Sequence, residues 1–153
     1  MAVLQLDGDG FAPLAVASAA PVGERVSVLS HPDKHFYCLN KGTVTRYSVS
    51  PRDPGMPPVA AMEISADFAR GSSGGPVLNP AGQVVGMVCS TTSVYHDDDD
   101  KVNQRNLQMV VKECVPSEQI RLVLSGEPVK TIIEESPAPT TQPRRSHPVP
   151  AEQ

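Results

Sequence analysis

The spacing of turn-forming residues most constrains how this chain folds. Apolar residues alternate with polar ones, or run for only a few positions, before Gly, Pro, Asn or Asp interrupts them. This pattern is typical of short β-strands joined by tight turns. We expect strands near residues 2–6, 25–29, 42–48, 59–64, 76–78, 83–89 and 107–111.

Two local signals mark individual elements. The run Asn79-Pro80-Ala81-Gly82 has Pro in the second turn position and Gly in the fourth, which favours a type I turn. It therefore predicts a hairpin between the strands on either side. After Pro116, Ser117 is a candidate helix N-cap that precedes polar and then apolar residues, so a short helix should close the fold.

The chain is long enough for one domain. Its 153 residues are too few for two independent cores. Because aromatic residues make up 4% and Trp is absent, the core must be built from aliphatic side chains. From about residue 126 the sequence turns to Pro, Thr, Ser and Arg without a hydrophobic pattern. We therefore expect a folded domain over 1–125 and a disordered Pro-rich tail over 126–153.

Charge and cysteine content exclude several classes of function. A formal net charge of −4 gives no electrostatic footprint for nucleic acid or an anionic membrane, and no segment is long enough to span one. The N-terminus has no basic leader and no long apolar run, so it predicts no signal peptide. Three cysteines without zinc-ligand spacing predict buried or partly buried thiols. We expect no metal and no cofactor.

An acidic run occupies residues 97–101, Asp-Asp-Asp-Asp-Lys. Four contiguous like charges are typical of a solvated loop, which is the interpretation we favour. The run also resembles the recognition sequence of enteropeptidase, and clustered carboxylates are the ligands of a Ca²⁺ site.

The stretch with most chemical content is Gly71-Ser72-Ser73-Gly74-Gly75-Pro76. A serine that attacks a carbonyl needs hydrogen-bond donors aimed at the developing oxyanion, and a tight glycine-rich turn can direct backbone N–H groups to that point. Such a stretch is also typical of a flexible loop. The Gly-x-Ser-x-Gly elbow of α/β-hydrolases requires a helix after the serine, whereas a hairpin is predicted here.

The same stretch resembles the nucleophile loop of the trypsin-like (chymotrypsin-fold) serine peptidases. The resemblance implies that Ser73 is the nucleophile and that the N–H groups of Gly71 and Ser73 form the oxyanion hole. It extends to the segments 21–32, 42–46 and 107–111 and covers roughly residues 1–125. It implies an all-β fold, an antiparallel barrel of six to seven strands that corresponds to the second barrel of the family. Serine at position 72 is similar to the bacterial members.

The resemblance also implies a substrate-binding region. The residues before the oxyanion turn and the strand after it would line the pocket for the substrate side chain. The candidates are Asp67, Phe68, Ala69, Arg70, Cys89, Ser90 and Thr91. An Asp in that pocket would favour Lys or Arg substrates by charge pairing, but an exposed loop carboxylate is the commoner state.

The family's histidine base and its aspartate come from a first barrel that has no counterpart in this sequence. The aspartate precedes a strand of the form Asp-x-Ala-Val-Leu, and this sequence begins Met1-Ala2-Val3-Leu4. We therefore expect a nucleophile half that is inactive alone, with a peptide or protein as substrate and a first barrel or a second copy as partner. The alternative is a non-catalytic peptide-binding module. Full-length relatives of this kind are often secreted or periplasmic, and the compartment of this chain is left open.

Overall fold

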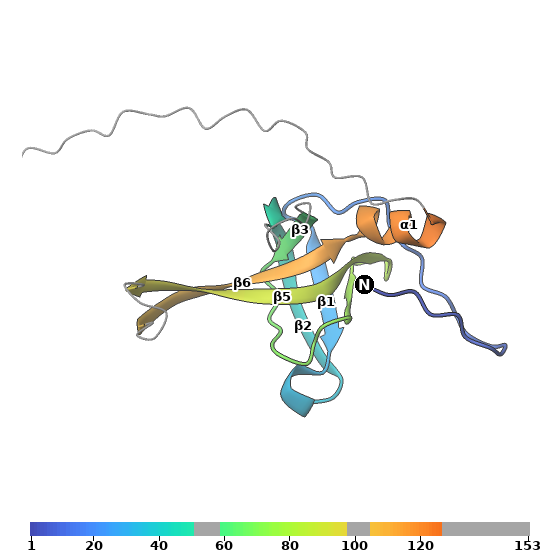
Figure 1. The fold of residues 1–153 in the computed structure, drawn as a ribbon, viewed down its shortest axis with the longest axis horizontal. Coiled ribbons are helices and arrows are strands. Elements are labelled where there is room, and N and C mark those ends of the chain that lie inside the picture. Colours follow the sequence, from blue (N-terminus) through green and yellow to red (C-terminus); the bar gives the residue numbers. More distant parts are fainter. Residues whose placement is uncertain (51–58, 98–104, 127–153) are drawn as a thin grey trace, which may run out of the picture.

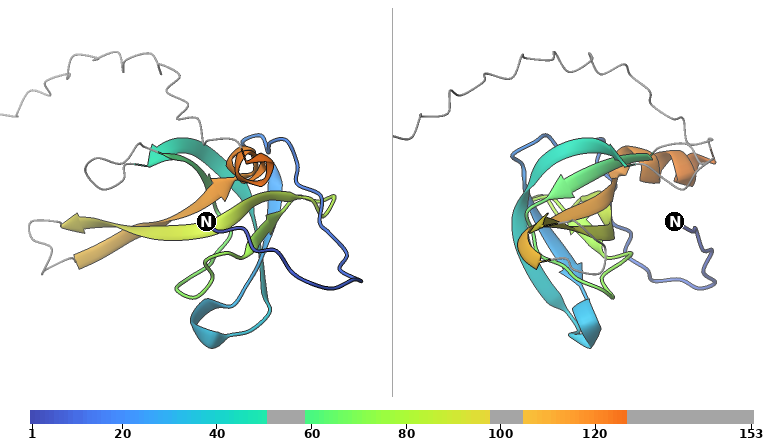
Figure 2. Two further views of the ribbon diagram at one scale, coloured as in Figure 1. Left: turned by 45° about the vertical axis from the view of Figure 1, so that its right-hand side comes forward. Right: turned by 60° about the vertical axis from the view of Figure 1, so that its left-hand side comes forward.

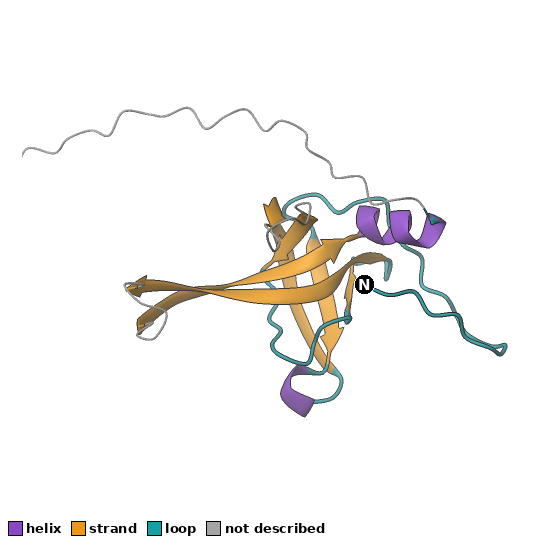
Figure 3. Cartoon of the chain, viewed as in Figure 1, coloured by secondary structure: helices purple, strands orange, loops and turns teal. Residues whose placement is uncertain are grey.

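Antiparallel strands form a closed barrel in the computed structural model, which describes residues 1–50, 59–97 and 105–126. Around the barrel the order is β1, β2, β3, β6, β5, β4. The strands are β1 (Arg25–Ser30), β2 (Cys38–Ser50), β3 (Val59–Ile64), β4 (Pro76–Leu78), β5 (Val84–Asp97) and β6 (Arg105–Pro116). A 3-10 turn, η1 (Pro32–Lys34), joins β1 to β2, and helix α1 (Ser117–Ser125) follows β6 (Figures 1 and 3). The predicted all-β barrel with a short closing helix is confirmed.

The core lies inside the barrel and is aliphatic, as the composition requires. Along β1 the buried residues Val26, Val28 and Ser30 alternate with more exposed ones, which is the period of a strand with one face inward. The other strands also contribute inward-facing apolar side chains. Phe68, in the loop after β3, is the aromatic residue of the buried cluster. The buried cluster comprises Ala20, Val26, Val28, Val44, Met62, Ile64, Ala66, Phe68, Val77, Val85, Val88 and Cys114.

The predicted hairpin joins β4 to β5. Gly82 N–H donates to Asn79 C=O at 2.9 Å, which closes the four-residue turn. The Asn79 side chain also accepts bonds from Ala81 N–H at 3.1 Å and from Gln83 N–H at 2.9 Å. Gly82 has a φ of 75°, a value that favours glycine. Strand β4 begins directly after the Gly-Ser-Ser-Gly-Gly stretch, and this turn returns the chain into β5.

Strands β5 and β6 are much longer than the sequence predicts. They pair from Gly86 opposite Pro116 out to Asp97 opposite Arg105. Strand β4 pairs with β5 only as far as Met87, and β3 pairs with β6 only at Glu113 and Cys114. The outer parts of the two strands therefore form a two-stranded ribbon that projects from the barrel (Figure 1 and the left view of Figure 2).

Two local predictions are wrong. Residues 2–6 alternate in hydropathy but form no strand, and Leu4 is 81% exposed. The N-terminal segment meets the barrel further along, where Val16 makes a parallel bridge to Val84. Ser117 is not the N-cap of α1: Pro116 occupies that position, and Ser117 is buried with its hydroxyl donating to Ser18 C=O at 3.4 Å.

The far C-terminal predictions fall outside the described residues. Helix α1 ends at Gly126, whose φ of 73° is the left-handed conformation usual after a helix. The predicted tail lies beyond this point except for that glycine, and the acidic run lies outside the described residues from 98 onward. None of the helices in the described ranges is long and apolar enough to cross a membrane.

Candidate functional site

Ser73 lies in the loop that leads from β3 into β4, and strand β5 holds this loop in place. Gly74 N–H donates to Val88 C=O, and Val88 N–H donates to Gly75 C=O, both at 2.9 Å. The Ser73 hydroxyl is exposed and donates to Cys89 C=O at 3.1 Å. The serine is therefore presented at the surface, next to the point where β5 leaves the barrel.

Glycines shape the turn around Ser73. Gly71 has a φ of 94° and Gly74 a φ of 88°, conformations that residues with a Cβ rarely adopt. Ser72 N–H donates to Ala69 C=O, and Gly75 N–H donates to Ser72 C=O, both at 3.0 Å. These two bonds fold the backbone into consecutive tight turns, with the Ser72 side chain buried beneath them.

The N–H groups of Gly71 and Ser73 remain available as donors. Within the described ranges neither of them donates a hydrogen bond, although their neighbours Ser72 and Gly74 do. Backbone donors without a partner can stabilise an oxyanion when both are aimed at one point.

The turn between β1 and β2 supports the other side of the Ser73 loop. Asp33 N–H donates to Arg70 C=O at 2.7 Å. A Cβ atom on Gly71 would lie 2.9 Å from His31 C=O, so the two backbones are in contact. His31 accepts a bond at Nδ1 from Tyr37 N–H at 2.8 Å and is exposed. In the described part of the chain no histidine and no carboxylate is hydrogen-bonded to Ser73.

A small hollow of about 60 Å³ opens beside Ser73. Its lining residues are Phe68, Ala69, Arg70, Ser73, Val88, Cys89, Ser90 and Thr91. The structure thus brings six of the predicted residues together with Ser73: Phe68, Ala69, Arg70, Cys89, Ser90 and Thr91. Val88 also lines the hollow, although the sequence does not predict this. The signal that could have identified it is its position directly before Cys89 on the predicted strand.

Asp67 points elsewhere. Its side chain is 86% exposed, and its carboxylate lies 3.6 Å from Lys112 Nζ. That ammonium also donates to Phe68 C=O at 2.7 Å and lies 5.5 Å from the centre of the Phe68 ring. Asp67 is not among the lining residues of the hollow. The commoner state, an exposed loop carboxylate, is the one observed.

The three cysteines are free thiols in different environments. Cys114 is buried and Cys38 partly so, but Cys89 is exposed, which corrects the prediction for that residue. Burial raises the pKa of the Cys114 thiol from its ordinary 9.0 to about 12, so it stays protonated at neutral pH. The described residues contain no cluster of three His, Cys, Asp or Glu side chains that would hold a metal.

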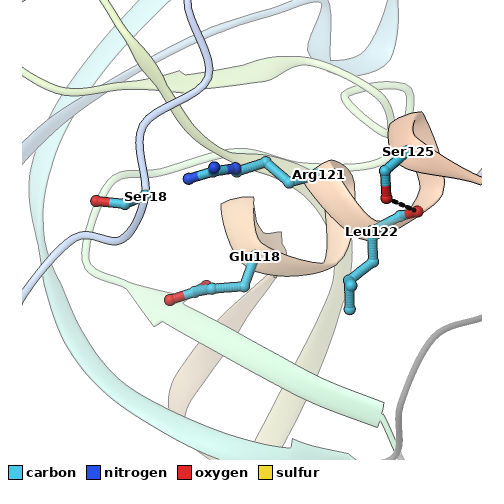
Figure 4. Close-up of a pocket in the computed structure, with 5 residues that line it drawn as sticks. All are labelled: Ser18, Glu118, Arg121, Leu122 and Ser125. Carbon is cyan, nitrogen blue, oxygen red and sulfur yellow. Dashed lines mark hydrogen bonds between the residues drawn. The ribbon is translucent and has the colours of Figure 1, made fainter. Parts of the chain in front are cut away.

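A larger hollow of about 370 Å³ lies beside α1 and shares no residue with the hollow at Ser73. It is lined by Ser18, Glu118, Arg121, Leu122 and Ser125 (Figure 4). Glu118 and Arg121 extend from the helix toward the segment that carries Ser18 (Figure 4). Ser125 donates to Leu122 C=O at 3.0 Å, so its hydroxyl already has a partner. No nucleophile and base face each other here.

Known proteins resemble this chain both in sequence and in fold. A sequence profile described as "Trypsin-like peptidase domain" matches residues 1–87. No curated protein sequence matches the chain. Among solved structures, the inactive form of the Rv3671c protease is similar at 22% identity and a TM-score of 0.56, over 74% of this chain and 53% of that one.

Two further structures agree in fold. The active form of the Rv3671c protease from M. tuberculosis gives 25% identity and a TM-score of 0.52, over 78% of this chain and 51% of that one. Deg5 gives 17% identity and a TM-score of 0.50, over 76% of this chain and 51% of that one. The chain spans about half the length of these structures.

Proposed function

Because this chain belongs to the trypsin-like peptidase family, we propose that it is the nucleophile half of a serine endopeptidase that cuts peptide bonds through an acyl-enzyme. One observation carries the proposal. Ser73 is presented on a glycine turn in which its own N–H and the N–H of Gly71 are free donors, beside a hollow of about 60 Å³. We also propose that this peptidase is of the bacterial type, because Ser72 is similar to the residue at that position in the bacterial members of the family.

Each site residue has a distinct role in this reaction. The Ser73 hydroxyl attacks the substrate carbonyl, and the N–H groups of Gly71 and Ser73 stabilise the negative charge that develops on its oxygen. The hollow receives the side chain before the cut bond, with Arg70 and Ser90 at its wall. Cys89 and Thr91, on β5, contribute backbone groups next to the nucleophile. Asp67 acts only at a distance, because its carboxylate is paired with Lys112.

The hydrogen bond that Ser73 makes explains why a base is needed. Its hydroxyl proton points to Cys89 C=O, and a peptide carbonyl is far too weak a base to remove that proton at neutral pH. A serine without an adjacent base is a poor nucleophile. We therefore propose that the chain alone is inactive and that a first barrel supplies the histidine and the aspartate, as it does in the family. The substrate would be a peptide or protein.

Exposed apolar side chains support a docked partner of this kind. The turn between β1 and β2, which contacts the Ser73 loop, carries Phe36 and Tyr37 at 70% and 79% exposure. Leu39 on β2 is also exposed. Large apolar side chains gathered in one place are typical of an interaction surface. A first barrel docked there would lie next to the nucleophile, and self-association through the same residues is the competing arrangement.

The second candidate is a peptide-binding module without catalysis. The observation that favours it is the Ser73 hydroxyl itself, which is already hydrogen-bonded to a backbone carbonyl. In that interpretation the free N–H groups of Gly71 and Ser73 and the neighbouring hollow bind the end of a peptide, and no covalent step follows.

A labelling experiment separates the two candidates. The 153-residue chain is treated with a fluorophosphonate, alone and joined to a first barrel that places a histidine and an aspartate before Met1. We expect slow labelling alone and fast labelling with the added barrel, lost in Ser73→Ala. Ser125→Ala, at an exposed serine on α1, is the matched control and should label normally. Equal rates for the joined protein and its Ser73→Ala variant would contradict the peptidase proposal and favour the binding module.

A further inference from the structure

The hollow beside Ser73 has a positively charged wall. Arg70 is an exposed residue of its lining, and within the described ranges the Arg70 guanidinium has no ion-pair partner. None of the other lining residues is Asp or Glu. A substrate side chain that enters the hollow therefore meets a positive charge that no lining carboxylate balances.

Lys112 places a second positive charge behind the same wall. In the ladder between β5 and β6 it lies opposite Thr91, and residues directly opposite one another project from the same face of a sheet. Thr91 lines the hollow, as does Phe68, whose C=O accepts a bond from Lys112 Nζ at 2.7 Å. The Lys112 side chain is only 13% exposed. Its ammonium is therefore held next to the hollow and shielded from most of the solvent.

The carboxylates near Lys112 lie outside the hollow. Asp67 is 3.6 Å from the ammonium, but its side chain is 86% exposed, so solvent screens its charge. Glu113 follows Lys112 on β6 and projects from the opposite face, where its carboxylate accepts a bond from the Ser90 hydroxyl at 2.8 Å. Neither carboxylate is part of the lining. The charge that faces the hollow is therefore positive.

We infer that this hollow selects an acidic side chain, that of aspartate, at the residue before the bond that is cut. The inference rests on the proposed function, because it takes the hollow as the place of that side chain. It deepens the proposed function by naming the substrate class, which is polypeptides with Asp before the cut bond. It reverses the preference for Lys or Arg that an Asp67 carboxylate inside the pocket would give.

The charge and the size of the hollow favour the same residue. A carboxylate would be attracted by both cations, whereas a Lys or Arg side chain would bring a third positive charge into a partly desolvated space. The planar guanidinium of Arg70 has the geometry to bond a carboxylate through two parallel N–H groups. The volume of about 60 Å³ equals that of about two water molecules at roughly 30 Å³ each. That space suits a short side chain, and Asp is the shortest acidic one.

The test measures binding to the full 153-residue chain carrying Ser73→Ala, so that no peptide is cut. The probes are acetyl-Ala-Val-Asp, acetyl-Ala-Val-Asn and acetyl-Ala-Val-Lys, compared by isothermal titration calorimetry. Asn has nearly the shape of Asp without its charge, so the ratio of these two affinities reports the charge. We expect the Asp peptide to bind about tenfold more tightly than the Asn peptide, because hydrogen bonds to an ionised group are the stronger ones. The Lys peptide should bind more weakly than the Asn peptide.

Variants that remove a charge locate the selectivity. Lys112→Met keeps an unbranched side chain without the ammonium, and Arg70→Gln removes the guanidinium. Each should lower the ratio of Asp to Asn affinity to about threefold, and the two together should lower it to about one. Lys41→Met on β2 and Arg121→Gln on α1 are the matched controls, because they remove the same charges at exposed residues outside the lining. A purely structural role of Lys112 would weaken the binding of both peptides equally.

Several outcomes overturn the inference. Equal affinity for the Asp and Asn peptides, tighter binding of the Lys peptide, or no binding of any of the three at millimolar concentration would each contradict it. An equal fall of the ratio in the control variants would contradict it as well. If Lys112→Met fails to fold, Arg70→Gln and its control decide, because both change exposed residues.

The proposed function fails on a different measurement. Labelling of the joined protein that does not depend on Ser73 would reject the peptidase, while a preference for the Asp peptide would still stand. Ser73-dependent labelling together with equal affinity for the three peptides would reject only the selectivity for Asp.

Discussion

Replacing Gly71 by Ala tests how the Ser73 loop is held. Gly71 combines a φ of 94° with close contact, because an added Cβ would lie 2.9 Å from His31 C=O and 3.3 Å from Asp33 N. The backbone conformation alone costs a residue with a Cβ about 1–3 kcal/mol. The contact adds about 1–3 kcal/mol, since two backbone segments must separate and the bond from Asp33 N–H to Arg70 C=O is strained.

Gly74→Ala is the matched control for this change. Gly74 has nearly the same φ, 88°, but nothing lies within 4 Å of the position of its Cβ. It should therefore lose only the conformational part, about 1–3 kcal/mol. Urea unfolding followed by far-ultraviolet circular dichroism measures both variants, and at constant m the difference in midpoint gives the contact term. Equal losses for the two variants would refute the contact between the Ser73 loop and the β1–β2 turn.

Three further predictions concern thiols and a buried carboxylate. At pH 8 a thiol-reactive dye should label Cys89 fastest, so that Cys89→Ala removes the fast phase, while buried Cys114 reacts only on unfolding. Because burial raises the pKa of Cys114 to about 12, the folded state holds this proton more tightly than the unfolded state. The stability that the protonated Cys114 thiol contributes is complete below its ordinary pKa of 9.0 and is lost as the pH rises toward 12. Over that range the urea midpoint of the parent chain should therefore fall more steeply with pH than the midpoint of Cys114→Ala. Ser48→Ala removes a hydroxyl that donates to the buried Glu63 carboxylate at 2.7 Å, which Arg46 also holds at 2.8 Å. The free energy of unfolding in urea should therefore fall by about 1–3 kcal/mol. An unchanged midpoint would show that water replaces the hydroxyl.

Local chemistry made parts of the fold predictable. The turn at Asn79 and Gly82 follows from residue types whose conformational preferences act within four positions. The glycine turn around Ser73 was recognised for the same reason, because its shape is specified by the glycines it contains. Both predictions needed no knowledge of which strands pair.

The sequence did not predict which strands and side chains pair with one another. Residues 2–6 alternate as a half-buried strand does, but alternation shows only that one face could be buried and not that a partner exists. The outer part of β5 runs through Ser90, Thr91, Thr92 and Ser93, where no apolar alternation marks a strand, and it is extended because β6 pairs with it. Asp67 was placed by its position before the turn, whereas Lys112, distant in sequence, decides where its carboxylate lies.

Cys89 connects the nucleophile to the ribbon. As the extra residue between Val88 and Ser90, it is outside the ladder with β6, and its carbonyl is free to accept the Ser73 hydroxyl at 3.1 Å. The same insertion shifts the alternation by one residue, because without it the backbone groups of Ser90 and Thr92 would face away from β6 in place of those of Thr91 and Ser93. One bulge therefore sets both the position of the carbonyl that accepts the Ser73 hydroxyl and the set of backbone groups that face away from β6. For that reason a change in the length of β5 at this point would move the Cys89 carbonyl away from Ser73 and reverse the facing direction of the residues that follow it.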